Sequence, residues 1–293
     1  MAPAVRSLAE FLGTEKAVVR VELSRVRGSS PRGEGTEMFV AASGLWGTIG
    51  GGQLEYRAIE SAREMLRDGD LSQSLDLPLG PEIGQCCGGR VEMALTRMRG
   101  SDMRAAIRRE TQTAETRPHV YVLGAGHVGR ALADQLQHLP VNCIVIDTRP
   151  EEIALCSADV DKRVRAIPEI DIMTAPAGSA FIVLTHDHAL DFLLTSAALE
   201  RGDAAYVGMI GSATKRVKFK NWMRRNCDGG DIDTLICPIG ASGSRDKRPS
   251  LIAAFVVAEV MAELTSEPAA AGPRETGTPP RSGHHQDQRG MWA

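Results

Sequence analysis

Apolar and polar positions follow two different patterns along the chain, and the change falls near residue 118. Beyond that point, short apolar runs alternate with segments whose apolar residues recur every three or four positions. The runs predict strands and the periodic segments predict helices, an order typical of right-handed βαβ units in a parallel sheet. The predicted strands are 119–123, 143–146, 162–167, 180–185 and 205–210, and the predicted helices are 130–138, 191–200, 213–225 and 250–264.

Ahead of residue 99 the pattern is mixed. Residues 17–26 and 90–97 alternate apolar and polar side chains, as half-buried strands do, and residues 37–42 and 44–49 resemble a hairpin. Residues 53–67 carry their apolar side chains on one helical face. We therefore predict an α/β protein, in which a small N-terminal α+β domain precedes a doubly wound parallel sheet domain.

Two further segments lack the pattern of a packed element. Residues 99–117 are charged and have few large apolar side chains, so they predict a short helix or a linker between the domains. Residues 266–293 are rich in Pro, Gly, Ala, Thr and Arg without an apolar period, which predicts a disordered tail. The predicted domains are therefore residues 1–98 and 118–265.

Composition and charge exclude several classes of protein. The 293 residues carry a net charge of −3, which gives no global electrostatic case for nucleic-acid binding. The longest apolar run, residues 251–258, is far shorter than the roughly 20 residues of a membrane-spanning helix. The N-terminus has no apolar segment of signal-peptide length, and six scattered cysteines do not form a secreted disulfide framework. We therefore expect a cytoplasmic protein that binds neither nucleic acid nor membrane.

A glycine loop joins the first predicted strand and helix of the second domain. Gly124, Gly126 and Gly129 have the spacing G-x-G-x-x-G, which gives a tight turn, lets backbone approach a pyrophosphate and lets strand and helix pack closely. Asp147 ends the next predicted strand, where an acidic residue often holds a ribose hydroxyl. These residues predict a Rossmann-like domain. Three roles for the loop stay open: binding a dinucleotide, accepting another phosphorylated ligand, or packing alone.

Two histidines follow the predicted strand 180–185. Doubly wound sheets bind ligands at the carboxyl ends of their strands, so His186 and His188 are candidates for acid–base groups or metal ligands that face a bound molecule. The alternative is that Asp187 caps the next helix and that both histidines are partly exposed loop residues.

Small residues form two loops in the first domain. Gly50, Gly51 and Gly52 lead into the predicted helix, and consecutive glycines ahead of a helix form an anion-binding nest. The alternative is a flexible turn between strand and helix, which one glycine would serve. Arg32 lies in the other loop, where its guanidinium suits a phosphate, although a surface turn also explains it.

The most unusual segment, residues 79–90, places two adjacent cysteines among four glycines. Cys86 and Cys87 lack the two-residue gap of zinc knuckles and thioredoxin-type sites. The neighbouring glycines free backbone N–H groups that favour a thiolate, and a thiolate suits a soft or sulfur-bound metal centre. The alternative is one buried cysteine with an incidental neighbour. The remaining cysteines are predicted packing residues, Cys143 and Cys156, or stay undecided, Cys227 and Cys237.

Together these motifs resemble the signature of the XdhC/CoxI family. The resemblance extends from residue 17 to residue 264, and the combination of motifs is highly specific. The segments that carry it are 28–32 (GSSPR), 47–55 (GTIGGGQLE), 79–90 (LGPEIGQCCGGR), 124–129 (GAGHVG), 185–191 (THDHALD), 206–212 (YVGMIGS) and 237–240 (CPIG). One departure is residues 241–248, which read ASGSRDKR where family members often have a more apolar, glycine-rich stretch.

The resemblance implies a chaperone that binds the molybdenum cofactor (molybdopterin) as cargo and shields it from oxidation. Such a protein holds the cofactor while a cysteine desulfurase supplies the terminal sulfido ligand, and then inserts it into the molybdenum subunit of apo xanthine dehydrogenase. The two cysteines would contact molybdenum through the cofactor. The predicted cofactor-binding residues are Arg32, Gly50, Gly51, Gly52, Gln85, Cys86, Cys87, Gly124, Gly126, Gly129, Asp147, His186 and His188.

Several points stay open at this stage. The sequence does not decide which cysteine contacts molybdenum, which glycine loop takes the phosphate, or whether a separate nucleotide binds the Rossmann-like loop. Nor does it decide between the pterin and dinucleotide forms of the cofactor, or between a monomer and a homo-oligomer.

A rival hypothesis is an NAD(P)-dependent oxidoreductase, since a complete Rossmann glycine loop with Asp147 is what such an enzyme has. That hypothesis leaves the cysteine loop unexplained and lacks a recognisable catalytic set. A pure interaction scaffold would explain neither glycine loop. We therefore expect a carrier rather than an enzyme.

Overall fold

The computed structural model describes residues 7–80, 88–227, 232–241, 244 and 246–265. The chain forms two compact units, Met1–Arg117 and Pro118–Ala293. No helix within these described ranges is long and apolar enough to cross a membrane. The predicted tail, residues 266–293, lies outside the described residues.

The first unit is built on an antiparallel sheet of five strands in the order β3-β2-β1-β5-β4. These strands are β1 (Val18–Arg27), β2 (Glu37–Ala41), β3 (Leu45–Gly47), β4 (Ser72–Pro78) and β5 (Arg90–Arg97). The predicted strands at 17–26 and 90–97 and the predicted hairpin are confirmed, with β1 at the centre of the sheet. Strand β4 is an edge strand without a fully buried side chain, which explains why the apolar pattern does not reveal it.

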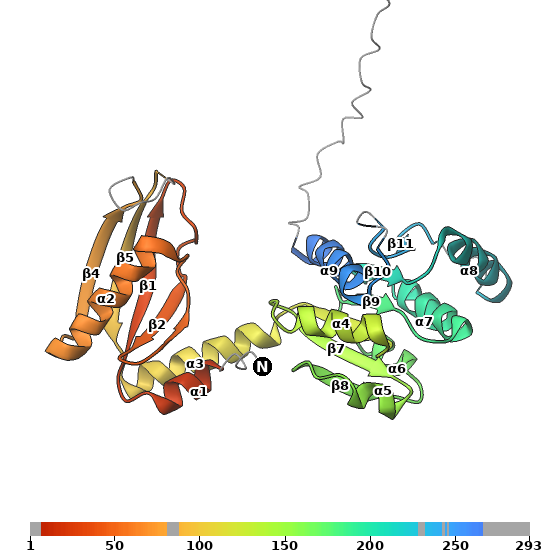
Figure 1. Ribbon diagram of the computed structural model, residues 1–293, viewed down its shortest axis with the longest axis horizontal. Helices are drawn as coiled ribbons and strands as arrows, with labels where there is room; N and C mark the ends of the chain where they lie inside the picture. The colour runs from red at the N-terminus through yellow and green to blue at the C-terminus, as the bar shows by residue number, and fades with distance from the viewer. Residues whose placement is uncertain (1–6, 81–87, 228–231, 242–243, 245, 266–293) are drawn as a thin grey trace, which may run out of the picture. The chain divides into compact units, whose positions relative to one another are not determined.

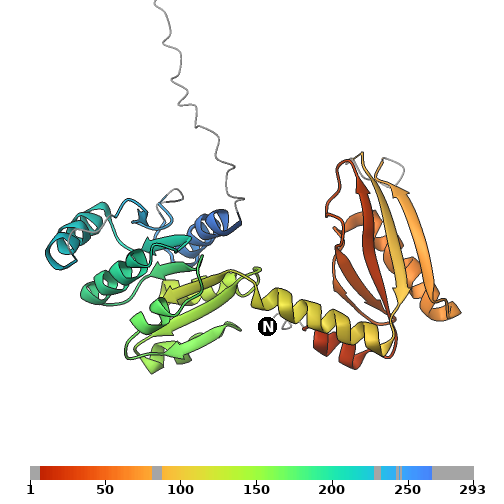
Figure 2. The same ribbon diagram turned by 180° about the vertical axis from the view of Figure 1, so that it is seen from behind.

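Helix α2 (Gly52–Asp68) covers one face of this sheet (Figure 1), and Figure 2 shows the strands in front of it. Leu54, Ala58, Ala62 and Met65 recur every three or four residues and are buried against the strands. The helix ends at Gly69, whose φ of 87° forms a left-handed C-cap. The predicted helix 53–67 is therefore confirmed.

Of the two predictions for residues 99–117, the helix is confirmed and the linker is wrong, because most of these residues form helix α3 (Gly100–Glu115) of the first unit. Its Met103, Ala106 and Ile107 have the i, i+3, i+4 spacing of one helical face and pack in a small core with helix α1 (Leu8–Thr14). Three moderately sized apolar side chains suffice for that contact, although they are few for a segment of this length. The first unit therefore extends to Arg117 instead of residue 98.

The second unit is a parallel sheet of six strands in the order β11-β10-β9-β6-β7-β8. The strands are β6 (His119–Leu123), β7 (Asn142–Asp147), β8 (Asp161–Val164), β9 (Ala180–Val183), β10 (Tyr206–Met209) and β11 (Leu235–Ile236). Successive strands run outward from β6 to one edge, and the chain then returns to add β9 beside β6. This is the doubly wound order, whose direction changes between β6 and β9.

Helices cover both faces of this parallel sheet. Helices α4 (His127–Leu136) and α9 (Pro249–Thr265) pack on one face, and α7 (His188–Glu200) and α8 (Ala213–Asn226) pack on the other. The short helices α5 (Pro150–Ala154) and α6 (Glu169–Met173) complete the crossovers near β8. The predicted α/β architecture, an α+β domain followed by a Rossmann-like domain, is confirmed.

Candidate functional site

The carboxyl ends of β6 and β9 meet where the strand order reverses, and several predicted site residues follow these two strands. The glycine loop follows β6, and the segment with the two histidines follows β9. A small cleft of about 10 Å³ lies at this point. It is lined by Leu123, Ile146, Asp147, Thr148, Pro168, Thr185, His186, Leu190 and Leu194. Open α/β sheets bind their ligands at this place.

The three loop glycines have different surroundings. A Cβ on Gly124 would lie 2.4 Å from the Leu184 carbonyl oxygen, and one on Gly129 would lie 1.9 Å from the Gly124 carbonyl oxygen. Apart from its chain neighbours, no atom of the described residues lies within 4 Å of the corresponding position on Gly126. Gly124 and Gly129 are therefore needed for packing, whereas Gly126 leaves open space in front of the loop.

Helix α4 begins at this loop without a side-chain cap, because its N-cap residue is Gly126. Helices α7 and α8 differ, since Asp187 and Ser212 cap them with side-chain oxygens. Uncapped backbone N–H groups at a helix N-terminus suit an anionic ligand such as a phosphate.

Asp147 is almost completely buried, and four donors occupy its carboxylate. Oδ2 accepts hydrogen bonds from the Ala125 backbone N–H at 2.7 Å and from Arg149 Nη2 at 3.0 Å. Oδ1 accepts from the Arg149 backbone N–H at 2.9 Å and from Arg149 Nε at 3.0 Å. Burial alone would raise the pKa of Asp147, but the hydrogen bonds from Arg149 and Ala125 outweigh it and hold the pKa below its usual value. A ribose hydroxyl would have to displace one of these donors.

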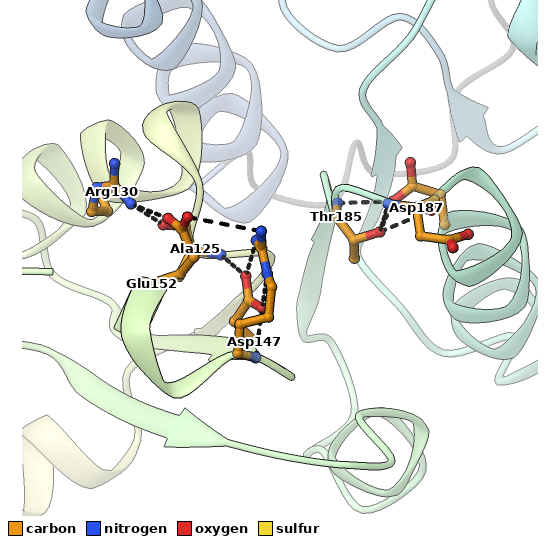
Figure 3. A network of polar contacts seen from close by, with 8 residues as sticks. Ala125, Arg130, Asp147, Glu152, Thr185 and Asp187 are labelled. Carbon is orange, nitrogen blue, oxygen red and sulfur yellow. Dashed lines mark hydrogen bonds and ion pairs between the residues drawn. The ribbon is translucent and has the colours of Figure 1, made fainter. Parts of the chain in front are cut away.

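A chain of charges continues from Asp147 to helix α4 (Figure 3). Arg130 Nη1 donates to the Ala125 carbonyl oxygen at 2.7 Å and to Glu152 Oε2 at 2.5 Å. Arg149 Nη1 lies 3.8 Å from Glu152 Oε1. The peptide groups on both sides of Ala125 are thus held, one through its N–H and the other through its C=O, which fixes the course of the loop ahead of Gly126.

The segment after β9 confirms the capping alternative for Asp187. Its Oδ1 accepts from the backbone N–H groups of Ala189 and Leu190 at 2.6 and 3.1 Å, and these bonds hold its pKa below the usual value. His186 is exposed and lines the cleft, while His188 is the exposed first residue of α7. Within the described ranges, no group of three or more His, Cys, Asp or Glu side chains is arranged to hold a metal ion.

A buried ion pair behind this segment escapes the sequence analysis. Lys215 Nζ lies 2.5 Å from Asp191 Oδ2, and both side chains are buried. Asp191 Oδ1 accepts from the backbone N–H and the hydroxyl of Thr185, both at 2.8 Å. Cys237 is buried nearby, where burial raises the pKa of its thiol, so it is a packing residue in this arrangement. The signal in the sequence is Asp191 on the first turn of an otherwise apolar helix.

In the first unit, Glu55 occupies the predicted glycine nest. Its Oε2 accepts from the backbone N–H groups of Ile49 and Gly51 at 3.0 and 3.1 Å, and the Gly50 N–H donates to Thr48 Oγ1 at 3.1 Å. Of the predicted nest donors, the N–H groups of Gly50 and Gly51 are therefore already paired within the chain.

The loop that carries Arg32 packs against this nest. A Cβ on Gly50 would lie 2.5 Å from Pro31 Cβ, and the Arg32 side chain beside it is exposed. Ser29 pairs with Gly88 in an isolated bridge, and a Cβ on Gly89 would lie 2.2 Å from the Ser29 carbonyl oxygen. Three motifs that are far apart in the sequence thus meet at one end of the first sheet.

The cysteine loop itself lies outside the described residues, including Gln85, Cys86 and Cys87. Its two flanks are described. The Leu79 N–H donates to the Gly89 carbonyl oxygen at 2.7 Å, and the Gly88 N–H donates to the Leu79 carbonyl oxygen at 2.9 Å. Gly88, which directly follows the cysteine pair, is therefore held beside Ser29 of the 28–33 loop.

Two protein-family models match the chain. One, described as the XdhC and CoxI family, matches residues 12–74, and the other, described as the XdhC Rossmann domain, matches residues 120–260. The first range contains the loops at 28–33 and 47–52, and the second contains the loop at 124–129. The cysteine loop lies between the two matched ranges.

Two known proteins resemble most of the chain. The uncharacterized protein YqeB of Escherichia coli (strain K12) is 26% identical over 261 residues, which are 83% of this chain and 42% of YqeB. The chain thus spans less than half the length of this relative. A crystal structure described as a xanthine dehydrogenase from Bacillus halodurans matches with a TM-score of 0.73 and 18% identity, covering 92% of this chain and 98% of that one.

At 18% identity, the structural likeness establishes the fold alone, and it extends over both units. The family follows from the two sequence models, which match the antiparallel unit and the parallel unit separately. The chain belongs to the XdhC and CoxI family.

Proposed function

We propose that this protein binds the molybdenum cofactor, protects it, and delivers it to apo xanthine dehydrogenase. The observation that carries the proposal is the convergence of three motifs at one end of the first sheet, where the 28–33 loop contacts both the 47–52 loop and the residues that follow the cysteine pair. Family membership adds the class of cargo and acceptor. A role in the maturation of xanthine dehydrogenase is consistent with this convergence of motifs and with the family membership.

The chemistry of the first unit suits the metal–sulfur end of such a cofactor. Cys86 and Cys87 would offer soft thiolate ligands, and Gln85 and Arg32 would offer polar contacts beside them. A cysteine desulfurase would then act on the bound cofactor. The flanks of the cysteine loop are held by hydrogen bonds, whereas Gln85, Cys86 and Cys87 themselves lie outside the described residues.

In the second unit, we assign a phosphate to the glycine loop at the start of α4. Support comes from the open space at Gly126, the missing side-chain cap, and the pairing of the N–H groups of Ile49, Gly50 and Gly51 in the first unit. The phosphate would belong to the cofactor itself or to a nucleotide. His186 would face the same ligand, since it lines the adjacent cleft.

The state of Asp147 argues against a nicotinamide-dependent oxidoreductase. Such an enzyme would use this carboxylate to accept a ribose hydroxyl, but Ala125 and Arg149 already donate to both oxygens. We therefore propose a carrier without turnover of its own, acting in the cytoplasm, as a monomer or a homo-oligomer.

Purification from a molybdenum-replete host tests the proposal. Metal analysis and absorption spectroscopy should find molybdenum and a pterin in the wild-type protein, and much less of both in the double variant Cys86→Ser, Cys87→Ser. Cys227→Ser, in the second unit, is the matched control and should retain the cofactor. Unchanged cofactor content in a folded double variant would remove these cysteines from the site, and bound nicotinamide would favour the oxidoreductase.

A further inference from the structure

Glu55 is a residue of the first unit to which the proposed function gives no role. It lies in the first turn of α2, and its carboxylate folds back into the loop ahead of that helix. Oε2 accepts three hydrogen bonds, from Thr48 Oγ1 at 2.5 Å and from the backbone N–H groups of Ile49 and Gly51 at 3.0 and 3.1 Å. A carboxylate in this position supplies the negative charge that a glycine nest attracts.

The Glu55 carboxylate is therefore an anion that the chain itself supplies to this loop. With the Gly50 N–H donating to Thr48 Oγ1, the three successive N–H groups at residues 49–51 all have partners. An external phosphate would have to displace Glu55 to reach them. Gly50 and Gly51 therefore serve the shape of the loop, and the Glu55 carboxylate fills its anion position.

Contacts extend from this loop to the flank of the cysteine pair. The place where a Cβ of Gly50 would lie is 2.5 Å from Pro31 Cβ, so the two loops are in direct contact. Two residues before Pro31, Ser29 pairs with Gly88, which directly follows the cysteines. The 48–51 loop, which Glu55 closes, thus contacts the 28–33 loop. The 28–33 loop in turn contacts the flank of the cysteine segment.

We propose that Glu55 is a positioning residue for cofactor binding, which closes the 48–51 loop so that the neighbouring 28–33 loop and Gly88 keep their places. This inference rests on the proposed function, because the cargo it positions is the molybdenum cofactor. Glu55 would not touch the cofactor. Removal of its carboxylate would vacate an anion site that a small carboxylate can refill.

The test compares Glu55→Ala with Glu60→Ala, which removes an exposed glutamate from the same helix. Glu55→Ala should lower the affinity for molybdenum cofactor by about tenfold, the ratio that corresponds to about 1.4 kcal/mol. Added formate should restore cofactor retention in Glu55→Ala and raise its thermal midpoint. Formate should change neither quantity in the wild type or in Glu60→Ala.

Wild-type cofactor affinity in Glu55→Ala would overturn the proposal. A loss that formate does not restore, in a variant with a native circular dichroism spectrum, would also overturn it. If the wild type binds no cofactor, the proposed function fails and the positioning role with it. The effect of formate on the thermal midpoint of Glu55→Ala is independent of cofactor and still decides whether Glu55 fills the nest.

Discussion

Gly126 and Gly129 belong to one loop, yet their surroundings predict opposite effects of substitution. Gly126 has a φ of −64°, which any residue adopts, and in the part of the chain that the structure describes no atom beyond its chain neighbours lies within 4 Å of its Cβ position. Gly126→Val should therefore keep the free energy of unfolding within about 1 kcal/mol of the wild type. The same variant should lose the phosphate-bearing ligand, because the new side chain fills the space in front of the loop.

Urea denaturation and cofactor retention after gel filtration measure the two effects separately. Gly129→Ala is the contrasting variant, because its Cβ would lie 1.9 Å from the Gly124 carbonyl oxygen. It should destabilise the protein by about 3 kcal/mol. If Gly126→Val loses stability but keeps its ligand, the loop has an architectural role alone.

Asp147 gives a prediction about acid stability. Because its folded-state pKa lies below the usual 3.8, its hydrogen bonds stabilise the protein fully above pH 3.8, and this contribution is lost as the pH falls through the folded-state pKa. Asp147→Asn should cost about 1–3 kcal/mol near neutral pH. The difference in free energy of unfolding between wild type and variant should shrink below pH 3.8.

Denaturation curves measured across that pH range check this expectation. Asp134→Asn on the exposed side of α4 is the control, and it should follow the wild type at every pH. A difference that stays constant down to the acid transition would contradict the ionised state of Asp147.

The positions of these side chains in the fold could be predicted from the sequence better than their roles could. Asp187 was recognisable as a helix cap because capping depends on the next few residues in the chain. Asp147 was placed at the correct strand end, but its donors include the side chain of Arg149 and the backbone of the glycine loop. Glu55 likewise looks like an ordinary surface residue of a helix, because nothing in the local pattern shows that it folds back onto the preceding loop.

At the scale of elements, burial decided what could be predicted. Strands β6, β7 and β9 are continuous apolar runs because both faces of the sheet are covered. Edge strand β4 and helix α3 are mostly exposed, so their composition resembles that of loops and linkers. Helix α1 had a local signal, since Ser7 and Glu10 form a capping box, and this motif would have found it.

The ion pair between α7 and α8 is the interaction between elements with the clearest expected cost. Lys215→Met leaves the Asp191 carboxylate buried without its charged partner, and should destabilise the protein by about 3–5 kcal/mol. The double variant Lys215→Met, Asp191→Asn removes both charges and keeps an acceptor for Thr185. It should recover much of that loss.

Urea denaturation of the two variants provides this comparison. A single variant as stable as the wild type would mean that water reaches Asp191 in solution. A double variant as unstable as the single one would show that the contacts of Lys215 with the Ile210 carbonyl oxygen, at 2.9 Å, outweigh the charge pairing.

For the whole molecule, the sequence was most informative where motifs of both units were read together. The glycine loop of the second unit alone is compatible with many ligands, since one fold carries many functions. The loops of the first unit are specific only in combination, because their contacts join residues 29, 50 and 88 across most of that unit. These contacts form only when the sheet has folded, so local sequence patterns cannot predict them.

A carrier must bind its cargo and also release it, which leads to the last prediction. The described loops hold few large side chains, and among the site residues that the structure describes no nucleophile with an adjacent general base stands out. We therefore expect this protein to raise the activity of apo xanthine dehydrogenase while turning over no substrate itself. The effect should be larger in air, where free cofactor is short-lived.

Reconstitution of the apo enzyme with molybdenum cofactor tests this handover in four mixtures, with and without this protein, under air and under anaerobic conditions. The measured quantity is the molybdenum content of the repurified enzyme, together with its activity. Loading should be greatest with the carrier present, and the carrier's advantage should be greatest under air because shielding then adds to delivery. The Glu60→Ala variant should deliver as well as the wild type, since its substitution lies on an exposed helix face. Equal loading in all four mixtures would refute the carrier function, and nicotinamide-dependent turnover by this protein alone would replace it with an oxidoreductase.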